Sequence, residues 1–447
     1  MHTARAVCVN SSWVSPPRAY SSSARPHAAA LRRGEEGPNL FTQCGGRGWG
    51  GSNKRLSIRN ALSEFPTVER TRDEELERIK AYRVPDLVSP YPWKRNQFAD
   101  NAKAEAYRWL DKYIPVQHVY ESPEELRDFR DSDLAEWAVL SFVDCGEKEL
   151  AWPAKLTLMT FILDDDIDDW CSPEKAMSTF FLELIVMILW SFPDDERLYQ
   201  NFVEFLDEGR VADRTQTLNY VHSKMAEARL KPGTLYDTSS VEAHWIIKAF
   251  GDLWAELYET MPDNFLRRWA LLWQIYLLEN VKEVVNRRYK ITPSVHSLTE
   301  ARRHTTGFWI FTKLLEFAEK VHVPDEVYDC PEMQRFLEAT GDALAFDNDL
   351  WSFQREAMRG DKNNMVVILS HSQDCSYVEA GMKTHQMMLD KLAEMEKAIV
   401  DVEKVTPPEY QEAISLYIRG LRNFYAGTHH WYEDCTSRYR KGVPNCN

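Results

Sequence analysis

Residues 156–169 read LTLMTFILDDDIDD, an apolar stretch that runs directly into five aspartates. If the stretch is helical, Asp164 and Asp168 project from one face, one turn apart, with Asp165 beside them. Like charges this close repel one another unless a cation lies between them, and carboxylate oxygens suit Mg²⁺. A solvated acidic helix end is the alternative interpretation. The apolar residues before Asp164 favour a core helix that ends in a metal site.

A second polar patch, Asn348 to Glu356, reads NDLWSFQRE. In a helix, Asn348, Ser352 and Glu356 lie four residues apart and stay within about 80° of arc. An amide oxygen, a hydroxyl and a carboxylate then converge, as the ligands of a hard metal ion do. Arg355 adds a cation suited to phosphate. An ordinary polar helix face is the alternative, which the presence of the first patch makes weaker.

Helical periodicity recurs through the chain after about residue 85, with no β alternation and no Asn-Gly or Asp-Gly hairpin turn. The segments expected to be helical are 96–114, 123–142, 174–190, 241–257, 264–285, 298–321, 333–355, 377–402 and 409–424. Seven of the 18 glycines lie within the first 51 residues, so the composition changes along the chain. These patterns predict an all-α fold, with an N-terminal extension over 1–84 and one helical domain over 85–447.

The extension has the composition of an organellar transit peptide, with five arginines in residues 1–33 and no acid before Glu35. A disordered tail without a targeting role is an equal alternative. The eight cysteines are scattered and form no zinc motif, which predicts reduced thiols in an intracellular protein. We therefore expect a cytoplasmic location, or an organelle if the extension is a transit peptide. His429 and His430 lack a third ligand at zinc spacing, so we interpret them as a surface pair.

Bulk composition excludes two classes of partner. The net charge of −15 disfavours binding to nucleic acid or to anionic lipid, because both depend on an excess of Lys and Arg. No apolar run reaches the roughly 18 residues of a membrane span, so no stable membrane insertion is expected. Hydrophobic residues make up 44% of the chain and aromatic residues 12%, enough for a large core and an aromatic cavity.

The two patches together resemble the metal-binding motifs of the class I terpene synthases. The family's D-D-x-x-D motif matches Asp164, Asp165 and Asp168. A second register, Asp165, Asp166 and Asp169, also fits. The ligand assignment within this run therefore stays open by one residue.

The family's N-D-x-x-S-x-x-x-E motif matches Asn348, Asp349, Ser352 and Glu356. The resemblance implies a single-domain helical bundle of the isoprenoid-synthase type around a central cavity. It also implies three Mg²⁺ ions, for which Mn²⁺ is a substitute. The ligands implied are Asp164, Asp165, Asp168, Asn348, Ser352 and Glu356.

Three further elements resemble the family and imply diphosphate-binding roles. Arg302 lies 46 residues before Asn348, where microbial members carry an arginine that senses the diphosphate. Gly307 matches a glycine that helps to trigger ionisation, although its spacing fits Arg303 slightly better, so both arginines are kept. Near the C-terminus, Arg438 and Tyr439 match a terminal signature that donates hydrogen bonds to the diphosphate, as Arg355 does on the second motif.

The activity implied is that of a terpene cyclase on a prenyl diphosphate, with farnesyl diphosphate first and the ten- and twenty-carbon substrates as alternatives. A monomer or homodimer is expected. Four aromatic side chains flank the motifs and are candidates for cation–π contact with a carbocation: Phe161, Trp309, Phe346 and Trp431. Residues 166–169 also spell the D-x-D-D motif of class II cyclases, which leaves the second patch unexplained. A chain-lengthening prenyltransferase would carry a second aspartate-rich motif, and a helical metal-binding scaffold would not need the arginines.

Overall fold

The computed structural model describes residues 71–113, 120, 122–168, 181–207, 214–238 and 245–439, apart from the side chains of Asp166 and Asp168. The chain divides into two units, 1–60 and 61–447, and every described residue belongs to the second. Within the described ranges the regular elements are helical and no strand occurs, which confirms the all-α prediction. Among these residues, no helix combines the length and the apolar character that a membrane crossing requires.

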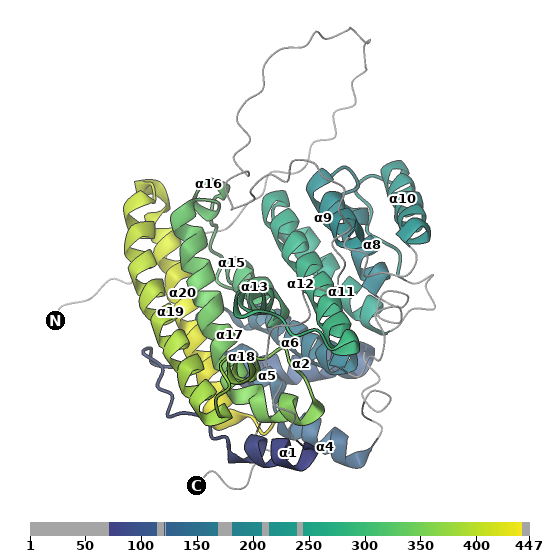
Figure 1. Cartoon of the computed structure of the whole chain (residues 1–447). Coiled ribbons are helices and arrows are strands. Elements are labelled where there is room, and N and C mark those ends of the chain that lie inside the picture. Colours follow the sequence, from purple (N-terminus) through teal and green to yellow (C-terminus); the bar gives the residue numbers. More distant parts are fainter. Residues whose placement is uncertain are drawn as a thin grey trace, which may run out of the picture. The chain divides into compact units, whose positions relative to one another are not determined.

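The helices follow the order shown in Figure 1. They are α1 (Arg72–Ala81), α2 (Ala99–Tyr113), α4 (Pro123–Asp131), α5 (Leu134–Ser141), α6 (Glu147–Asp168), α8 (Leu182–Ser191), α9 (Glu196–Asp207), α10 (Arg214–Leu230), α11 (Trp245–Thr260), α12 (Asp263–Tyr289), α13 (Val295–Thr305), α14 (Phe308–Lys313), α15 (Leu315–Ala318), α16 (Asp325–Tyr328), α17 (Pro331–Arg359), α18 (Met365–Ser372), α19 (Tyr377–Val405) and α20 (Gln411–His430). A short 3₁₀ turn, Pro408–Tyr410, precedes α20, and a π-helical turn, Trp431–Cys435, follows it directly.

The longest helices place the two acidic patches. α17 has Pro331 at its first position and stops at Gly360, which adopts a left-handed conformation that favours glycine. It packs along α19 and also contacts α13 and α20, and Figure 1 shows α17, α19 and α20 side by side. α6 packs against α2 and α5 and ends at Asp168. The first patch therefore ends one helix, and the second lies inside another.

Two predicted helices are interrupted by left-handed backbone. The segment 123–142 divides into α4 and α5 at Asp133, whose φ is 42°. The segment 298–321 divides at Gly307, whose φ is 73°, and again at Leu314. α1, α9, α10, α16 and α18 lie outside the predicted ranges. In α10 the pattern is weak, since only Val221, Met225 and Ala228 are buried.

Residues 71–84, which the sequence analysis placed in the N-terminal extension, carry the ordered helix α1. α1 begins with a capping box between Thr71 and Glu74, which satisfies free backbone groups at the helix start. Arg78 donates to Ser370 Oγ and to a backbone carbonyl. The buried hydroxyl of Tyr82 donates to the Leu350 carbonyl at 2.9 Å. This segment is therefore folded against α17 and α18, whereas the transit-peptide interpretation falls on residues outside the described ranges.

An aromatic stack joins α11 to α12 and leads toward the centre of the bundle. The rings of Phe250 and Trp273 stack with centroids 5.0 Å apart, and those of Trp254 and Trp269 with centroids 5.6 Å apart. Tyr276 follows, 5.3 Å from Trp273. Offset aromatic stacking adds to the stabilisation from burial, so this wall of the bundle is well ordered.

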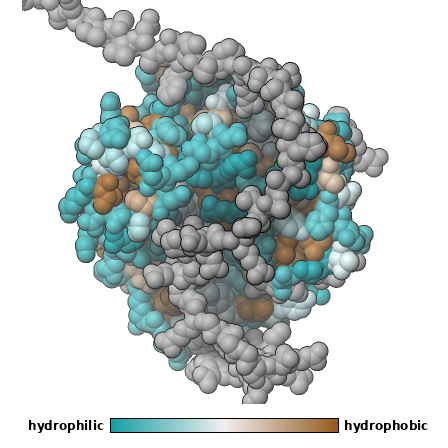
Figure 2. All heavy atoms as spheres, turned by 90° about the horizontal axis from the view of Figure 1, so that it is seen from above, coloured by the Kyte–Doolittle hydropathy of each residue, from teal (hydrophilic) through white to brown (hydrophobic). Residues whose placement is uncertain are grey.

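The described surface is mainly polar on the face that Figure 2 shows, and apolar side chains there occur in small separate groups. Among the large exposed apolar side chains, Val88 and Trp93 lie between α1 and α2, Leu230 ends α10, and Val378, Met382, Leu389, Val400 and Val405 are spread along α19. Single exposed apolar residues are normal on a globular protein and indicate no partner.

α5 and α20 are in close backbone contact at Gly427, where a Cβ atom would lie 2.0 Å from the Leu140 carbonyl oxygen. We predict that Gly427→Ala lowers the free energy of unfolding by about 3 kcal/mol, because backbone has to move. In the control Gly420→Ala, also on α20, the added Cβ would meet only the flexible carboxylate of Glu319, at 3.0 Å. Urea denaturation measures both variants, and equal stabilities would contradict this packing.

Candidate active site

A cavity lies between α5, α6, α12, α13, α14, α17 and α20, and it holds about 1000 Å³ of space including its solvent-open mouth. Its aromatic and apolar lining consists of Trp137, Phe161, Tyr276, Phe308, Phe311, Leu344 and Phe424. Its polar lining includes Asp164, Glu283, Arg302, Asn348, Arg355, Glu356, Tyr432 and Tyr439. The cavity thus combines an aromatic surface with a cluster of charged groups.

Asp165 follows the cavity-lining Asp164 in the sequence and binds two arginines. Arg438 donates from Nη1 and Nη2 to the two carboxylate oxygens at 2.9 and 2.7 Å, and Arg355 Nη2 donates at 2.6 Å. The hydroxyl of Tyr120 donates at 3.0 Å. Burial alone would raise the pKa of Asp165, but Arg438 and Arg355 hold it below its usual range. An ionised carboxylate therefore connects α6, α17 and the C-terminal segment.

The rest of the aspartate run is more open. Asp164 lines the cavity with 40% of its side chain exposed, and its Oδ2 lies 3.8 Å from Nη2 of Arg438. The guanidinium of Arg438 also lies over the ring of Phe161, 5.2 Å from the centroid, so it lies between the charged and aromatic groups. The side chains of Asp166 and Asp168, and all of Asp169, lie outside the described residues. The register of the first motif therefore stays a prediction.

Asn348 faces the cavity from α17 and is held on both sides. Its Oδ1 accepts from Arg302 Nη2 at 2.5 Å, and its Nδ2 donates to the Tyr432 hydroxyl at 2.9 Å. Asp349, the next residue, is buried and accepts from Arg302 Nε at 2.9 Å and from the Met365 backbone at 2.8 Å. Burial raises the pKa of Asp349 to about 7 although Arg302 opposes the shift. Asp349 thus anchors α13 and α18 to the motif helix, and Asn348 is the member that faces the cavity.

Ser352 and Glu356 meet at a residue that the sequence analysis missed. The Nδ2 of Asn364 lies 3.4 Å from Ser352 Oγ and 3.0 Å from Glu356 Oε2, and it donates to the Asp349 carbonyl at 2.9 Å. Glu356 lines the cavity, whereas Ser352 is buried behind it. Asn364 also caps α18. Asn364 lies eight residues after Glu356, outside the motif, so only the fold shows this contact.

The structure separates the two adjacent arginines of α13. Arg302 is buried and lines the cavity. Arg303 instead binds Asp342 of α17, which also contacts Lys391 at 3.2 Å, and it does not line the cavity. Gly307 lies at the break between α13 and α14 and is likewise not a lining residue. Of Arg302, Arg303 and Gly307, it is Arg302 that contacts Asn348 and Asp349 of the second motif.

The aromatic wall differs from the four predicted candidates. Trp137 makes edge contacts with Phe161, Phe311 and Phe424, at centroid distances of 6.3, 4.7 and 5.3 Å. Its indole N–H donates to the Thr428 hydroxyl at 3.0 Å. Of the four candidates, Phe161 lines the cavity, and the other three, Trp309, Phe346 and Trp431, are buried elsewhere. Position beside a motif did not reveal which ring faces the cavity.

Tyr439 reaches the cavity from the C-terminal segment, as Tyr432 does from the π-helical turn. The two rings are 5.5 Å apart, and Trp431 packs 6.1 Å from Tyr439 and 5.6 Å from Phe161. Trp431 therefore supports the wall from behind. This packing brings the C-terminal segment to the same cavity as the two acidic patches.

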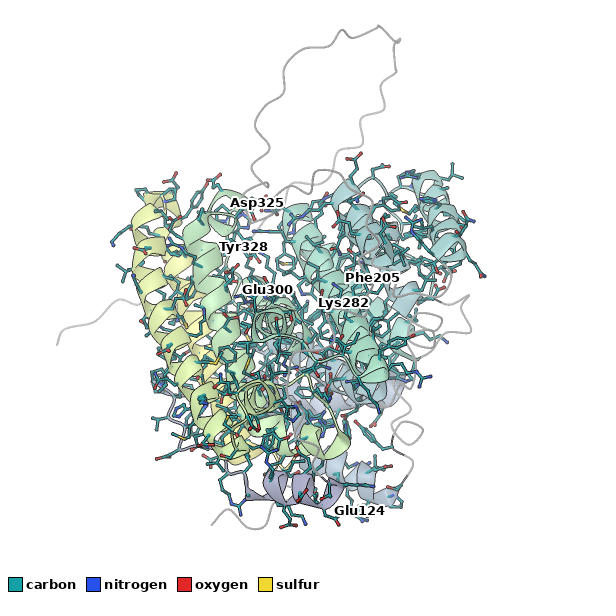
Figure 3. All side chains as sticks on the ribbon, viewed as in Figure 1. Glu124, Phe205, Lys282, Glu300, Asp325 and Tyr328 are labelled. Carbon is teal, nitrogen blue, oxygen red and sulfur yellow. The ribbon has the colours of Figure 1, made fainter. Side chains whose placement is uncertain are left out.

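Glu283 of α12 is a further cavity residue that the sequence analysis missed. Its Oε1 lies 3.9 Å from Arg302 Nη1 and has no hydrogen-bond partner among the described residues. Burial raises the pKa of Glu283 to about 8. Figure 3 labels Lys282 on α12 and Glu300 on α13, the two helices that carry Glu283 and Arg302. An isolated Glu within α12 carries no motif, so only the fold could reveal it.

The interpretation of His429 and His430 as a surface pair is wrong for His429. This residue is buried on α20, and its Nδ1 lies 2.9 Å from the carboxylate of Asp347. His430 is half-buried and stacks on Trp93 with ring centroids 3.8 Å apart. Consecutive helical residues point about 100° apart, so one ring enters the interior while its neighbour does not.

The donors around the cavity fit a divalent metal and an anion together. Asp164 on α6 and Asn348 and Glu356 on α17 present oxygen atoms, the ligands that Mg²⁺ prefers. Arg302 on α13 and Arg355 on α17 also line the cavity and are suited to phosphate oxygens. The arrangement can therefore hold an anionic ligand through metal ions and guanidinium groups at once.

Comparison with known proteins supports this chemistry. Residues 204–394 match the family model "Terpene synthase family 2, C-terminal metal binding", a span that includes the second patch. The chain is 27% identical over 376 residues to alpha-gurjunene synthase of Marchantia polymorpha, which covers 80% of this chain and 86% of the relative. It is 24% identical over 278 residues to 7-epi-alpha-eudesmol synthase ((2E,6E)-farnesyl diphosphate cyclizing) of Streptomyces viridochromogenes, covering 60% and 78%.

Two solved structures share the fold. The crystal structure of a-eudesmol synthase aligns with a TM-score of 0.59 at 18% identity, covering 78% of this chain and 98% of that one. The linalool/nerolidol synthase of Streptomyces clavuligerus, in complex with 2-fluorogeranyl diphosphate, aligns with a TM-score of 0.60 at 18% identity, covering 79% and 100%. At this identity the likeness concerns the arrangement of helices.

Asp165 is paired with the guanidinium groups of Arg438 and Arg355, which are 8% and 19% exposed, so its removal tests the charge network. We predict that Asp165→Asn lowers the free energy of unfolding by about 2–3 kcal/mol, because unpaired buried charge is costly while repulsion from Asp164 is relieved. The control Asp207→Asn breaks an ion pair with Arg214 in which the two side chains are 55% and 46% exposed, and it should cost about 0.5 kcal/mol or less. Urea denaturation without metal measures both, and equal losses would contradict the network.

Proposed function

We propose that this chain is a metal-dependent sesquiterpene synthase of the terpene synthase family, because residues 204–394 match the family model and the chain is 27% identical to alpha-gurjunene synthase over 376 residues. The substrate is farnesyl diphosphate, and the products are a sesquiterpene and inorganic diphosphate, which makes the enzyme a carbon–oxygen lyase. The single observation that carries the proposal is the cavity itself. It joins oxygen ligands from α6 and α17, guanidinium groups and an aromatic wall.

The fifteen-carbon substrate is supported by the relatives. The names of the synthases from Streptomyces viridochromogenes and Streptosporangium roseum specify cyclisation of (2E,6E)-farnesyl diphosphate. The ten-carbon alternative is kept because the linalool/nerolidol synthase structure holds 2-fluorogeranyl diphosphate. Products of defined chain length distinguish these alternatives.

The residues that would hold the metal come from both patches. Asp164 on α6 and Asn348 and Glu356 on α17 face the cavity, and Ser352 lies behind Glu356. Asp165 or Asp168 completes the set on α6 in the register that the motif implies. We propose Mg²⁺, three ions by resemblance, as the metal. Bound metal would neutralise the diphosphate and so favour its departure.

The arginines bind the leaving group in this proposal. Without ligand, Arg438 and Arg355 are paired with Asp165, and Arg302 is paired with Asn348 and Asp349. A diphosphate offers these cations more negative charge and bidentate oxygen geometry. The C–O bond then breaks with its electron pair on the diphosphate, which leaves an allylic carbocation. Preorganised donors stabilise the charge that develops on the leaving group.

The aromatic wall shields the carbocation and sets its folding. Trp137 contacts Phe161, Phe311 and Phe424 around the cavity, so it fixes the positions of these rings relative to itself. Faces of such rings attract a cation, and the apolar wall excludes water that would trap it early. The reaction ends when the cation loses a proton to the released diphosphate or to solvent, or when it captures one water molecule and the resulting protonated alcohol then loses a proton.

The direct test is incubation of the purified protein with geranyl, farnesyl and geranylgeranyl diphosphate and MgCl₂, with product identification by gas chromatography and mass spectrometry. We expect a sesquiterpene from farnesyl diphosphate and none after chelation of the metal. Asp164→Ala and Asn348→Ala should each lower kcat/KM by about 100-fold or more while helical content by circular dichroism is unchanged. Absence of product from all three substrates would refute the proposal.

The separation of the two arginines gives a second test. We predict that Arg302→Lys lowers kcat/KM by about 100-fold, since the fork that binds Asn348 and reaches the leaving group is lost. Arg303→Lys alters only the contact with Asp342 and should change kcat/KM by less than about 3-fold, with some loss of stability. Steady-state kinetics measures both variants, and the reverse ranking would assign the sensing role to Arg303.

A further inference from the structure

Asp347 precedes Asn348 on α17 but faces away from the cavity. It is fully buried, and each carboxylate oxygen has a donor in the helix bundle. Nδ1 of His429 lies 2.9 Å from Oδ2, and the indole N–H of Trp351 donates to Oδ1 at 3.2 Å. A buried carboxylate is costly unless it is paired, so the partner on α20 constrains the direction in which Asp347 points.

His429 lies in the last turn of α20, just before the π-helical turn. Its ring is stacked parallel to that of Tyr425, with centroids 6.3 Å apart. Tyr432 in the π-helical turn accepts the hydrogen bond from Asn348 at 2.9 Å. Two adjacent residues of α17 are therefore bound to the last turn of α20 and to the π-helical turn that follows it. Insertions of π-helical turns occur often at functional sites, which fits this junction.

The geometry of a helix makes the pairing of Asp347 matter for its neighbours. Successive side chains leave the axis about 100° apart, so fixing one direction fixes those of Asn348 and Glu356. Mg²⁺ requires near-octahedral geometry at about 2.0–2.1 Å and tolerates little displacement of its ligands. A small rotation of α17 would carry the ligand oxygens out of place even though the fold was retained.

We propose that the buried Asp347–His429 pair is a positioning pair that sets the rotation of α17 and so aims its metal-binding face into the cavity. The inference rests on the proposed function, because it takes Asn348 and Glu356 as metal ligands. The pair also links that face to the C-terminal segment that carries Arg438. Residues of this kind, which act through a metal ligand, typically change metal affinity by 10- to 100-fold when removed.

A matched buried pair on the same helix provides the control. Asp342 of α17 is also fully buried, and it binds Arg303 of α13 and Lys391 of α19. None of these three residues lines the cavity. If burial and pairing alone mattered, loss of Asp342 and loss of the Asp347 pairing would act alike on stability and on catalysis.

The experiment compares His429→Leu, His429→Asn and Asp342→Asn by urea denaturation and by activity on farnesyl diphosphate as a function of MgCl₂ concentration. We expect His429→Leu to raise the half-activating Mg²⁺ concentration about 10-fold. Asparagine places an N–H near the position of Nδ1, so His429→Asn should return this concentration to within about 3-fold of wild type. Asp342→Asn should lose stability without a change in Mg²⁺ dependence.

Trp351→Phe is a milder variant that removes the other donor to Asp347, and it should raise the Mg²⁺ requirement about 3-fold even if His429→Leu does not fold. Unchanged Mg²⁺ dependence in both, or the same change in Asp342→Asn, would overturn the inference. Asn348→Ala separates this failure from failure of the proposed function. If Asn348→Ala is inactive while His429→Leu behaves as wild type, only the positioning role is refuted.

Discussion

The pairing of Asp165 with Arg355 and Arg438 is the interaction on which the rest of the site depends. It joins three segments that lie far apart in the sequence, namely α6, α17 and the residues after the π-helical turn. Buried charges are tolerated only when they are paired, so this carboxylate fixes the arginines beside the aspartate run before any ligand arrives. The cations that suit a diphosphate are therefore held next to the carboxylates that suit its metal ions.

Three consecutive residues of α17, at the start of the second motif, make contacts in three different directions. Asp347 points to α20, Asn348 to the cavity and Asp349 to α13 and α18. Each direction follows from the rotation of about 100° between helical neighbours. The side chain of Asn348 is held in place by the contacts of Asp347 and Asp349 as much as by its own contacts. Those neighbouring contacts prevent α17 from rotating about its axis. The motif is therefore a part of the packing of four helices as well as a set of ligands.

Much of this could be predicted from local sequence, and the remainder depends on tertiary contacts. The spacing of Asn348, Ser352 and Glu356 already places them on one face of a helix, and periodicity located most long helices. Periodicity cannot show where left-handed backbone interrupts a helix, as at Asp133 and Gly307. Nor can it show which of two neighbouring side chains turns inward. Arg302 is buried whereas the adjacent Arg303 is half-buried, and His429 is buried whereas the adjacent His430 is half-buried.

The central claim is that the cavity binds diphosphate and divalent metal as one unit. Calorimetric titration of inorganic pyrophosphate into the full-length protein, with MgCl₂ and separately with a chelator, measures this coupling directly. The account predicts binding about 100-fold tighter with Mg²⁺, equivalent to about 2.7 kcal/mol, because the arginines are otherwise engaged by Asp165 and free carboxylates repel the anion. Equal affinity with and without the metal would contradict it.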